Sequence, residues 1–196
     1  MRAAPDLGWP LVTARLHLRP FGATDVDALL PLHADPVAVR YVPFEPRDRA
    51  GVVDVLARKT AHRTLAADGD LLELAVVRTA DDALVGDVLL ALSSLTHENL
   101  EVGYLFGRAY EGQGYATEAV GALLALAFDT FEARRVTARV DTRNEASRRL
   151  LLRLGFRQEA ELVENEWFKG TWGSEVDYAL LRREWSARTG TGGSAT

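Results

Sequence analysis

The sequence predicts a single α/β or α+β domain built around a mixed sheet. Strand-like and helical segments alternate along the 196 residues, and no segment repeats another. The clearest helical stripe, from Ala116 to Phe131, directly follows a strand-like segment and a glycine-rich turn. Interleaved elements of this kind pack as layers against a sheet. The length is that of one domain, which we expect to span residues 1–185.

The first half of the chain is expected to contribute three strands and two helices. Leu16 and Leu18 alternate with polar residues before Pro20, which is the period of a half-buried strand over Val12–Arg19. Thr24 offers a hydroxyl cap to the first helix. A second, amphipathic helix is expected over Arg47–Ala67, followed by strands over Leu71–Val77 and Leu84–Leu92.

The second half is expected to alternate strands with two helices. The segment Leu100–Phe106 places Glu101 and Gly103 on one face of a strand and larger residues on the other. Asn144 caps a helix that ends at Gly155. Further strands are expected over Arg135–Val140, Leu162–Phe168 and Glu175–Leu181, and residues 186–196 are expected to form a disordered tail.

The composition excludes several functional classes. The chain has no cysteine, which rules out disulfide scaffolds, thiolate metal sites, thiol redox chemistry and cysteine nucleophiles. Its net charge of -5 disfavours a nucleic-acid partner. No apolar run approaches the ~20 residues of a membrane span, so we expect a cytoplasmic protein without a membrane partner. The four histidines show neither metal-binding nor triad spacing, and no metal site is expected.

The glycine-rich stretch RAYEGQGYATEA, which begins at Arg108, carries the most chemical information. A strand that runs through Gly112 and Gly114 into a helix directs backbone N–H groups outward at the positive helix end, a geometry that binds phosphate. The simpler interpretation is a loop that only reverses the chain. Gln113 replaces the Lys of an ATP-binding Walker A loop, and Thr117 replaces a glycine of the dinucleotide fingerprint. The turn therefore predicts a phosphate ligand without identifying it.

Several further motifs occur in a fixed order along the chain. They are TARLHLRPF and ADPVAVRYV near the start, EVGY before GQGYATEA in the centre, NEAS with LGFR further on, and DYALL with EW at the end. Together they resemble the GNAT superfamily of acyl-CoA-dependent N-acetyltransferases and, within it, the RimJ/RimL-like branch. The similarity covers the chain from about Thr13 to Trp185, and it depends on the order and spacing of the motifs rather than on one of them.

The resemblance implies a GNAT-like mixed, mostly antiparallel sheet that is splayed between its fourth and fifth strands and flanked by helices. The opening would hold the pantetheine arm of acetyl-CoA, and no metal would be needed. Backbone groups of Tyr104, Leu105 and Phe106 would lie along that arm as an added strand does, and Asn144 would touch it. The pyrophosphate would bind the turn formed by Gly112, Gln113, Gly114, Tyr115, Ala116 and Thr117.

Two residues depart from the family pattern. Glu111 stands where many members have Arg or Gln, and its carboxylate would repel a pyrophosphate unless it points into solvent or meets Arg108. Leu151 stands where many members place a Tyr that protonates the departing thiolate. In the RimJ/RimL-like branch, the family suggests Ser147 for that role.

Each catalytic candidate has a purely structural alternative. Ser147 lies on the apolar face of its helix, where a hydroxyl requires a partner, and it either serves the thiolate or bonds local backbone. Glu101 would accept the amine proton if burial raises its pKa, and otherwise it is a solvated residue of the strand. Glu164, Glu166 and water are the other candidates for the general base.

Residues near the predicted C-terminal hairpin have two interpretations as well. Trp167, Phe168 and Trp172 either form an aromatic wall for the acceptor or pack the hairpin against itself. Asp177 either binds a cationic amine or accepts hydrogen bonds from backbone.

The resemblance implies an N-acetyltransferase that moves acetyl from acetyl-CoA to a primary amine, such as a protein N-terminus or a small-molecule amine. The attack would be direct, in a ternary complex, because no cysteine can form an acyl-enzyme. A non-catalytic acyl-CoA sensor with the same fold is the alternative, and a nucleotide-dependent enzyme is a weaker one. The sequence leaves open the acceptor, the length of the acyl donor and the formation of a homodimer.

Overall fold

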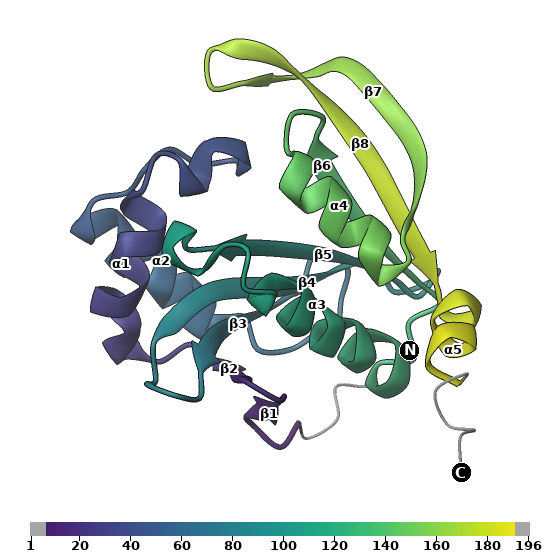
Figure 1. Ribbon diagram of the computed structural model, residues 1–196, viewed down its shortest axis with the longest axis horizontal. Helices are drawn as coiled ribbons and strands as arrows, with labels where there is room; N and C mark the ends of the chain where they lie inside the picture. Colours follow the sequence, from purple (N-terminus) through teal and green to yellow (C-terminus); the bar gives the residue numbers. More distant parts are fainter. Residues whose placement is uncertain (1–6, 191–196) are drawn as a thin grey trace.

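The computed structural model describes residues 7–190, and the residues at both ends lie outside this range. An eight-stranded sheet forms its centre, with neighbouring strands in the order β1-β2-β3-β4-β5-β6-β8-β7 (Figure 1). Strands β5 and β6 are parallel, whereas the other neighbouring pairs are antiparallel. This arrangement confirms the mixed, mostly antiparallel sheet flanked by helices.

The elements follow the predicted order along the chain, except that the strand predicted over Val12–Arg19 is two short antiparallel strands joined by a turn. The strands are β1 Leu11–Val12, β2 Leu16–Pro20, β3 Leu71–Arg78, β4 Leu84–Ser94, β5 Asn99–Phe106, β6 Arg135–Asp141, β7 Arg157–Phe168 and β8 Thr171–Leu181. The α-helices are α1 Val26–Ala34, α2 Arg49–Ala61, α3 Tyr115–Ala125, α4 Glu145–Leu154 and α5 Arg182–Gly190. Short 3-10 turns are η1 Ala23–Asp25, η2 Ala38–Tyr41 and η3 Arg108–Tyr110, and η4 Leu126–Thr130 is a π-helical turn.

Alternation along the strands sends side chains to two cores, one on each face of the sheet. On one face, Leu74, Val88 and Val102 pack with residues of α3 and α4. On the other face, Ala75 and Leu105 pack with residues of α1 and α2. Successive side chains of a strand point to opposite faces of the sheet. Glu101 on β5 faces the α1 and α2 side, whereas Ser147 belongs to α4 on the other side.

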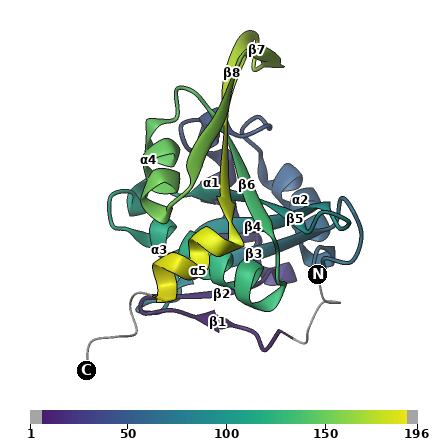
Figure 2. The same ribbon diagram turned by 90° about the vertical axis from the view of Figure 1, so that its right-hand side faces the viewer.

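The sheet opens between β5 and β6, which are the fourth and fifth of the predicted strands. Asn99–Glu101 pair with Arg135–Thr137, and beyond these residues the two strands separate. Strand β6 instead pairs with β8 over its whole length, so it follows the β7–β8 hairpin away from β5. Figures 1 and 2 show this hairpin as a long arm above the rest of the molecule, with α4 beside β6 at the opening. We call this opening the notch.

Two helix predictions in the first half are wrong in detail. Thr24 does not cap the first helix; the Asp25 carboxylate accepts the Gly22 N–H at 2.8 Å and pairs with Arg19 at 2.7 Å. The second helix ends at Ala61 rather than Ala67. It stops there because Arg63 forms a β-bridge with Leu72. The local sequence pattern does not predict this pairing with the sheet.

Two predictions in the second half also change. The helical stripe ends at Ala125 as an α-helix and continues as the π-helical turn, which still buries Phe128 and Phe131 completely. Residues 186–190 belong to α5 and not to a tail, because Trp185 stacks on Phe128 and Arg188 donates to the Arg153 carbonyl at 3.1 Å. The remainder of the predicted tail, residues 191–196, lies outside the described residues.

The hairpin strands β7 and β8 are longer than predicted. Lys169 and Gly170 form the turn between them with φ of 47° and 79°, the left-handed conformation that tight hairpin turns require. Over residues 7–190, none of the helices combines the length and the apolar character that crossing a lipid bilayer demands.

Candidate functional site

The free edge of β5 faces the notch. Between Val102 and Phe106, β5 pairs with β4 on one edge, and the described residues provide no strand on the other. Backbone groups on that edge are therefore open to an extended ligand, which can bind them as an added strand would. Tyr104, Leu105 and Phe106 lie in this stretch, as the sequence predicts.

The glycine-rich turn leads from η3 into α3. Gly112 has a φ of 71°, and Gly114, the N-cap of α3, has a φ of 81°, both in the left-handed region. Tyr115 and Ala116 open α3, so their backbone N–H groups have no acceptor within the helix, and the glycine-rich turn leads directly into this end. Free amides at the positive end of a helix can bind an anion, so the turn has the geometry predicted for it.

Arg15 holds this turn against the first strand of the sheet. Its Nη1 donates to the Gln113 carbonyl at 2.9 Å, and its Nε donates to the Glu118 carboxylate at 2.7 Å. Thr13 Oγ1 donates to the same carboxylate at 2.6 Å. The sequence analysis missed Arg15 and Glu118, although both lie inside the motifs quoted above. Their contact joins residues about a hundred positions apart, and periodicity carries no signal for it.

The side chains on the first turn of α3 are engaged with the protein. Tyr115 is buried, with the Arg15 guanidinium 4.7 Å from its ring centre and the Arg78 guanidinium 5.9 Å away. Thr117 Oγ1 accepts a hydrogen bond from Arg153 at 3.4 Å. The turn therefore offers its amides to a ligand while its larger side chains anchor it.

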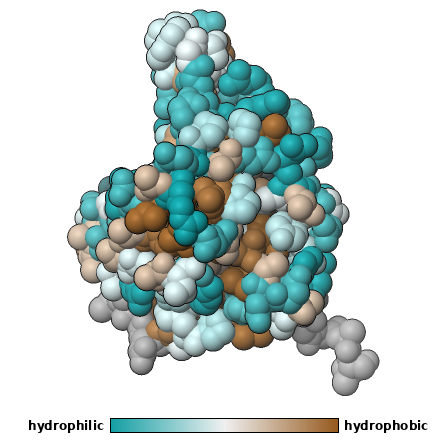
Figure 3. Space-filling model, turned by 90° about the vertical axis from the view of Figure 1, so that its left-hand side faces the viewer, coloured by the Kyte–Doolittle hydropathy of each residue, from teal (hydrophilic) through white to brown (hydrophobic). Residues whose placement is uncertain are grey.

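Glu111, the first departure from the family pattern, is exposed to solvent. The alternative, a contact with Arg108, is wrong, because Arg108 lies 4.0 Å from Asp35. Arg108 and Asp35 border a hollow of about 490 Å³ between α1 and η3, lined also by Pro31, Leu84 and Tyr110. Figure 3, which views the α1 and α2 side of the molecule, shows apolar residues gathered near its centre.

Ser147 and Tyr104 meet on the α4 side of the notch. Ser147 Oγ donates to the Tyr104 hydroxyl oxygen at 3.0 Å, and Asn144 Oδ1 accepts the Ser147 N–H at 3.1 Å as the cap of α4. Burial raises the pKa of Tyr104 to about 12, although the Ser147 hydrogen bond acts in the opposite direction. Tyr104 therefore stays protonated near neutral pH. Its side chain is a functional candidate that sequence reasoning missed, since that reasoning used only its backbone.

Leu151, the second departure from the family pattern, is a residue of α4 whose side chain is completely buried in the core. It leaves the position of the family's usual Tyr filled by a packing residue. The hydroxyl pair of Tyr104 and Ser147 supplies proton donors on this side instead.

Glu101 lies on the opposite face of the sheet, in a pocket of about 230 Å³. We call it the acceptor-side pocket; its lining residues are Tyr41, Pro43, Glu101, Arg139, Asp141, Glu166, Phe168, Gly173, Ser174 and Glu175. Solvent reaches the Glu101 carboxyl, yet the pocket walls surround it closely. Burial raises its pKa, the carboxylates of Asp177 and Glu175 add to that rise, and Arg139 opposes it.

The structure separates the remaining candidates. Glu166 and Phe168 line the acceptor-side pocket together with Glu101. Glu164 is not among the lining residues, and it occupies a bulge with a φ of 49°. Trp167 and Trp172 are 62% and 56% exposed and pack edge to face on the hairpin, so of the three predicted aromatic residues only Phe168 lines the pocket.

Asp177, His33 and His62 have structural partners. Arg139 Nε donates to Asp177 Oδ1 at 2.8 Å, so this carboxylate is already paired with a cation. His33 and His62 belong to a charged cluster on the α1 and α2 side. Among the described residues there is no group of three or more His, Asp or Glu side chains arranged to hold a metal ion.

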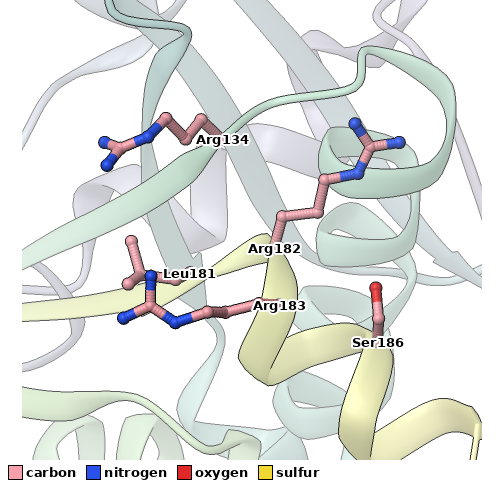
Figure 4. A pocket seen from close by; sticks show the side chains of 5 residues that line it. All are labelled: Arg134, Leu181, Arg182, Arg183 and Ser186. Carbon is pink, nitrogen blue, oxygen red and sulfur yellow. The ribbon is translucent and has the colours of Figure 1, made fainter.

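A separate hollow of about 380 Å³ lies at the start of α5, lined by Arg134, Leu181, Arg182, Arg183 and Ser186. Its arginine side chains do not converge, because Arg182 extends away from Arg134 and Arg183 (Figure 4). The Arg182 guanidinium lies 4.0 Å from Glu132. This hollow is therefore not grouped with the notch or with the acceptor-side pocket.

Comparison with known proteins agrees with this geometry. Residues 15–157 match the acetyltransferase (GNAT) domain. The protein named uncharacterized N-acetyltransferase p20, from Bacillus licheniformis, is 28% identical over 177 residues, which cover 90% of this chain and 98% of p20. YdaF of Bacillus subtilis, whose name proposes a ribosomal N-acetyltransferase, is 32% identical over 105 residues, covering 54% of this chain and 57% of YdaF.

A solved structure shares the fold as well. Spermidine N-acetyltransferase from Vibrio cholerae, in complex with CoA and spermine, superposes with a TM-score of 0.75. The match covers 88% of this chain and 99% of the other, at 20% sequence identity.

Proposed function

The chain belongs to the GNAT family of N-acetyltransferases, and on this premise we propose that it transfers acetyl from acetyl-CoA to a cationic primary amine by direct attack in a ternary complex. One observation carries the proposal. The notch lies between a carboxylate with a raised pKa, Glu101, and a half-buried hydroxyl pair, Tyr104 and Ser147, on opposite faces of the sheet. An amine can lose its proton on one face while a thiolate receives one on the other.

Acetyl-CoA binding in this proposal uses mainly backbone. The amides from Gly112 to Ala116 suit the pyrophosphate, because they lie at the positive end of α3. The free edge of β5 suits the pantetheine arm, whose amides can pair with strand backbone. Asn144 lies at the N-terminal end of α4, next to the hydroxyl pair. Thr117 lies on the first turn of α3, and its hydroxyl already accepts a hydrogen bond from Arg153.

The charge of the acceptor-side pocket favours a cationic acceptor. Arg143 pairs with Asp141 at 2.6 Å, and Arg139 lies 3.8 Å from Glu175. Glu101 and Glu166 have no ion pair or hydrogen bond to their carboxylates within the described residues. Four acidic residues, Glu101, Asp141, Glu166 and Glu175, line the pocket against the single cation of Arg139, and this excess favours a protonated amine over a neutral or anionic acceptor.

The chemical step follows from these positions. Glu101, directly or through water, accepts a proton from the amine, whose lone pair then attacks the thioester carbonyl. A C–N bond forms, the C–S bond breaks, and the sulfur takes a proton from the Tyr104 hydroxyl. Ser147 donates to the Tyr104 oxygen and stabilises the charge left on it. The attacking nitrogen becomes cationic as the C–N bond forms, and it then releases its second proton, which returns through water to the Tyr104 oxygen. Glu101 passes its proton to solvent, so the step is complete without an acyl-enzyme.

Two families of acceptor fit this pocket charge. A protein N-terminus is favoured by the relative named for a ribosomal N-acetyltransferase, and a polyamine by the solved structure that binds spermine. The cytoplasmic location, the acetyl rather than longer acyl donor and the possible homodimer remain predictions.

A screen that detects free CoA thiol tests the function. Acetyl-CoA and succinyl-CoA are offered with a panel of polyamines, amino acids, aminoglycosides and short peptides with free N-termini. We expect thiol release with acetyl-CoA and at least one cationic amine, and a much smaller rate for Glu101→Gln. The non-catalytic sensor is the alternative, and stoichiometric CoA binding without thiol release on any acceptor would favour it. Tight binding of ATP or NAD in preference to CoA would favour the nucleotide-dependent enzyme.

A further inference from the structure

A cluster of charged side chains is buried under the sheet face that also carries Glu101. It joins four elements: Asp87 on β4, Glu73 on β3, Lys59 on α2 and His33 on α1. His33 is the most deeply buried, with 1% of its surface exposed. Buried charges reduce stability unless each has a partner, so the partners of this cluster reveal what it holds in place.

Lys59 is the centre of the cluster. Its Nζ lies 2.6 Å from Glu73 Oε1 and 3.2 Å from Asp87 Oδ2. Burial acts to lower the pKa of Lys59, but the two carboxylates outweigh it and hold that pKa above its ordinary value. For Asp87, burial acts to raise the pKa, and Lys59 with His33 outweighs it in the other direction. Both groups therefore stay charged near neutral pH.

His33 connects this centre to the chain between α1 and α2. Its Nε2 lies 3.2 Å from Asp87 Oδ2, and its Nδ1 lies 2.9 Å from Nη1 of Arg47. A guanidinium can only donate, so Nδ1 must accept and Nε2 must carry the hydrogen that it donates to Asp87. The contacts thus require the neutral ring in one tautomer, with Arg47 at one end and Asp87 at the other.

Arg47 and Phe44 fasten the connecting segment to this histidine. The Arg47 backbone N–H donates to the His33 carbonyl at 3.0 Å, and the Arg47 guanidinium lies 3.7 Å from the centre of the Phe44 ring. The Phe44 ring in turn stacks on His33 with a centroid distance of 5.0 Å. Three contacts therefore fix residues 44–47 on a buried, charged base.

The fastened segment also forms a wall of the acceptor-side pocket. Tyr41 and Pro43 line that pocket, directly before Phe44 in the chain. On the other side of Tyr41, the Val39 carbonyl accepts a hydrogen bond from Lys169 Nζ at 2.6 Å, which ties η2 to the tip of the β7–β8 hairpin. The pocket wall thus has two attachments, one to the hairpin and one to His33.

The cluster does not itself reach the reacting groups. Asp87 pairs with Leu105, whereas Ala91, four residues further along β4, pairs with Glu101. That separation is about 13 Å along the strand, at ~3.3 Å per residue. Its effect on the reaction must pass through the pocket wall.

We propose that neutral His33, bridging Asp87 and Arg47, is a positioning residue that sets the acceptor-binding wall formed by Tyr41 and Pro43. The inference depends on the proposed function, because it assigns the acceptor-side pocket to the amine. Loss of the bridge should release the wall and weaken amine binding, while the amides at α3 and the hydroxyl pair at α4 are unaffected.

Arg47→Met tests the bridge at its outer, partly exposed end, and Arg63→Met is the matched control. Arg63 also lies near the end of α2, and it donates to the Thr60 and Phe21 carbonyls at 2.7 and 3.3 Å, away from the wall. For Arg47→Met we expect the KM for the amine to rise roughly 5- to 30-fold, in line with loss of a buried hydrogen bond and misplacement of a wall. The kcat and the Kd for acetyl-CoA should change less than about twofold. Arg47→Lys, which keeps a donor for His33 Nδ1, should recover part of the loss.

A second variant and a second measurement keep the test independent of folding and of turnover. His33→Leu, which cannot bridge, should raise the amine KM as Arg47→Met does. Hydrogen exchange at the Val42 and Phe44 amides should be faster in Arg47→Met than in Arg63→Met, with no change at α3 or α4. Equal KM values for Arg47→Met and Arg63→Met, equal exchange at these amides, or a parallel loss of acetyl-CoA affinity would overturn the proposal. If the wild-type protein binds CoA but acetylates no amine, the proposed function fails, and the exchange measurement still decides whether Arg47 holds the wall.

Discussion

The glycine-rich turn and the acceptor-side pocket are built in opposite ways. The turn presents backbone amides from one short stretch, Gly112 to Ala116, at the start of a helix. The pocket presents side chains from η2, β5, β6, β7 and β8, which are distant in sequence and meet only in the folded sheet. The first surface suits a ligand group common to a whole family, and the second can change its ligand by single substitutions.

This difference teaches where specificity resides in this chain. An amide cradle binds any pyrophosphate of the right shape, because backbone donors are the same in every residue. Charge and wall position in the pocket distinguish one amine from another. Variants of the pocket should therefore alter turnover and acceptor choice, whereas variants of the turn should alter donor binding.

The largest expected effect is on turnover in Glu101→Gln. The amide keeps the shape of the side chain but cannot accept the amine proton, so kcat should fall by about 10² to 10⁴-fold, the usual range for general base catalysis. In the wild-type protein, activity should rise with pH through the raised pKa of Glu101, since the carboxylate form is the base. A pH–rate profile should show this rise in the wild type and lose it in the variant.

Glu166→Gln is the matched control for that prediction. It removes the other unpaired carboxylate of the pocket, and it should raise the amine KM without removing the pH-dependent rise. If Glu166→Gln abolishes the rise and Glu101→Gln does not, the base has been assigned to the wrong strand.

Ser147→Ala and Tyr104→Phe should have the next largest effect. Each should lower kcat by roughly 10 to 1,000-fold and leave acetyl-CoA affinity nearly intact, because a donor used as charge develops affects turnover more than binding. The double variant should lose little more than the worse single variant, since the two hydroxyls act through one hydrogen bond of 3.0 Å. Steady-state kinetics of the four proteins measure this coupling. Wild-type turnover by Ser147→Ala across the pH range would remove Ser147 from this role, and wild-type turnover by Tyr104→Phe as well would exclude the pair as the proton donor.

Gly114→Val should act on donor binding alone. A branched side chain resists the φ of 81° and would crowd Arg15, whose Nη2 lies 3.3 Å from the position of an added Cβ. At CoA concentrations 100 times the wild-type Kd, the wild type should gain about 2.7 kcal/mol of stability, and the variant should gain none. Thermal unfolding with CoA, ATP and NAD measures this gain, and only CoA should stabilise the wild type.

Gly69→Val provides the control, because Gly69 has a similar φ of 91° with open space around it in the loop before β3. It should lose stability from backbone strain yet keep the full gain from CoA. A normal CoA gain in folded Gly114→Val would show that the turn is not the pyrophosphate site.

Acidification should produce the smallest effect and should separate the two surfaces. The pKa of Asp87 is lowered in the folded protein, so its contribution to stability is present above its unfolded pKa of ~3.9 and is lost as pH falls through the folded value. In the proposed attachment Asp87 anchors the acceptor wall, so acidification below about pH 3.9 should weaken amine binding before it weakens CoA binding. Urea unfolding of the wild type and of Asp87→Asn between pH 7 and pH 3 should show a steeper loss in the wild type. Identical pH dependence in both would remove Asp87 from this role.

The local prediction succeeded where neighbouring residues decide the structure. The two faces of Leu100–Phe106, the glycine-rich turn that leads into α3 and the Asn144 cap of α4 are all as expected. It failed where distant residues decide. The second helix ends early because Arg63 pairs with Leu72 in the sheet, and α5 replaces part of the predicted tail because Trp185 packs on Phe128.

The candidate site also has features that neighbouring residues decide and features that distant contacts decide. Motif order was enough to identify the glycine-rich turn, Ser147 and Glu101 as candidates, since each lies in a contiguous motif. It could not show that the Ser147 partner is Tyr104, 43 positions away, or that Tyr41 and Glu166 share a pocket with Glu101.

The sequence by itself determined the class of the fold and the amide turn, because hydrophobic period and turn chemistry act over a few residues. The order and spacing of its motifs carried the resemblance to the family. Only the tertiary structure decided which side chains join Glu101 and Tyr104 on the two faces of the sheet, and how the segment with Tyr41 and Pro43 is attached. Those features depend on the separation of β5 from β6 and on a buried cluster assembled from four elements. Contacts of this kind form when the chain closes long loops, and side-chain identity alone does not specify which distant partners will meet.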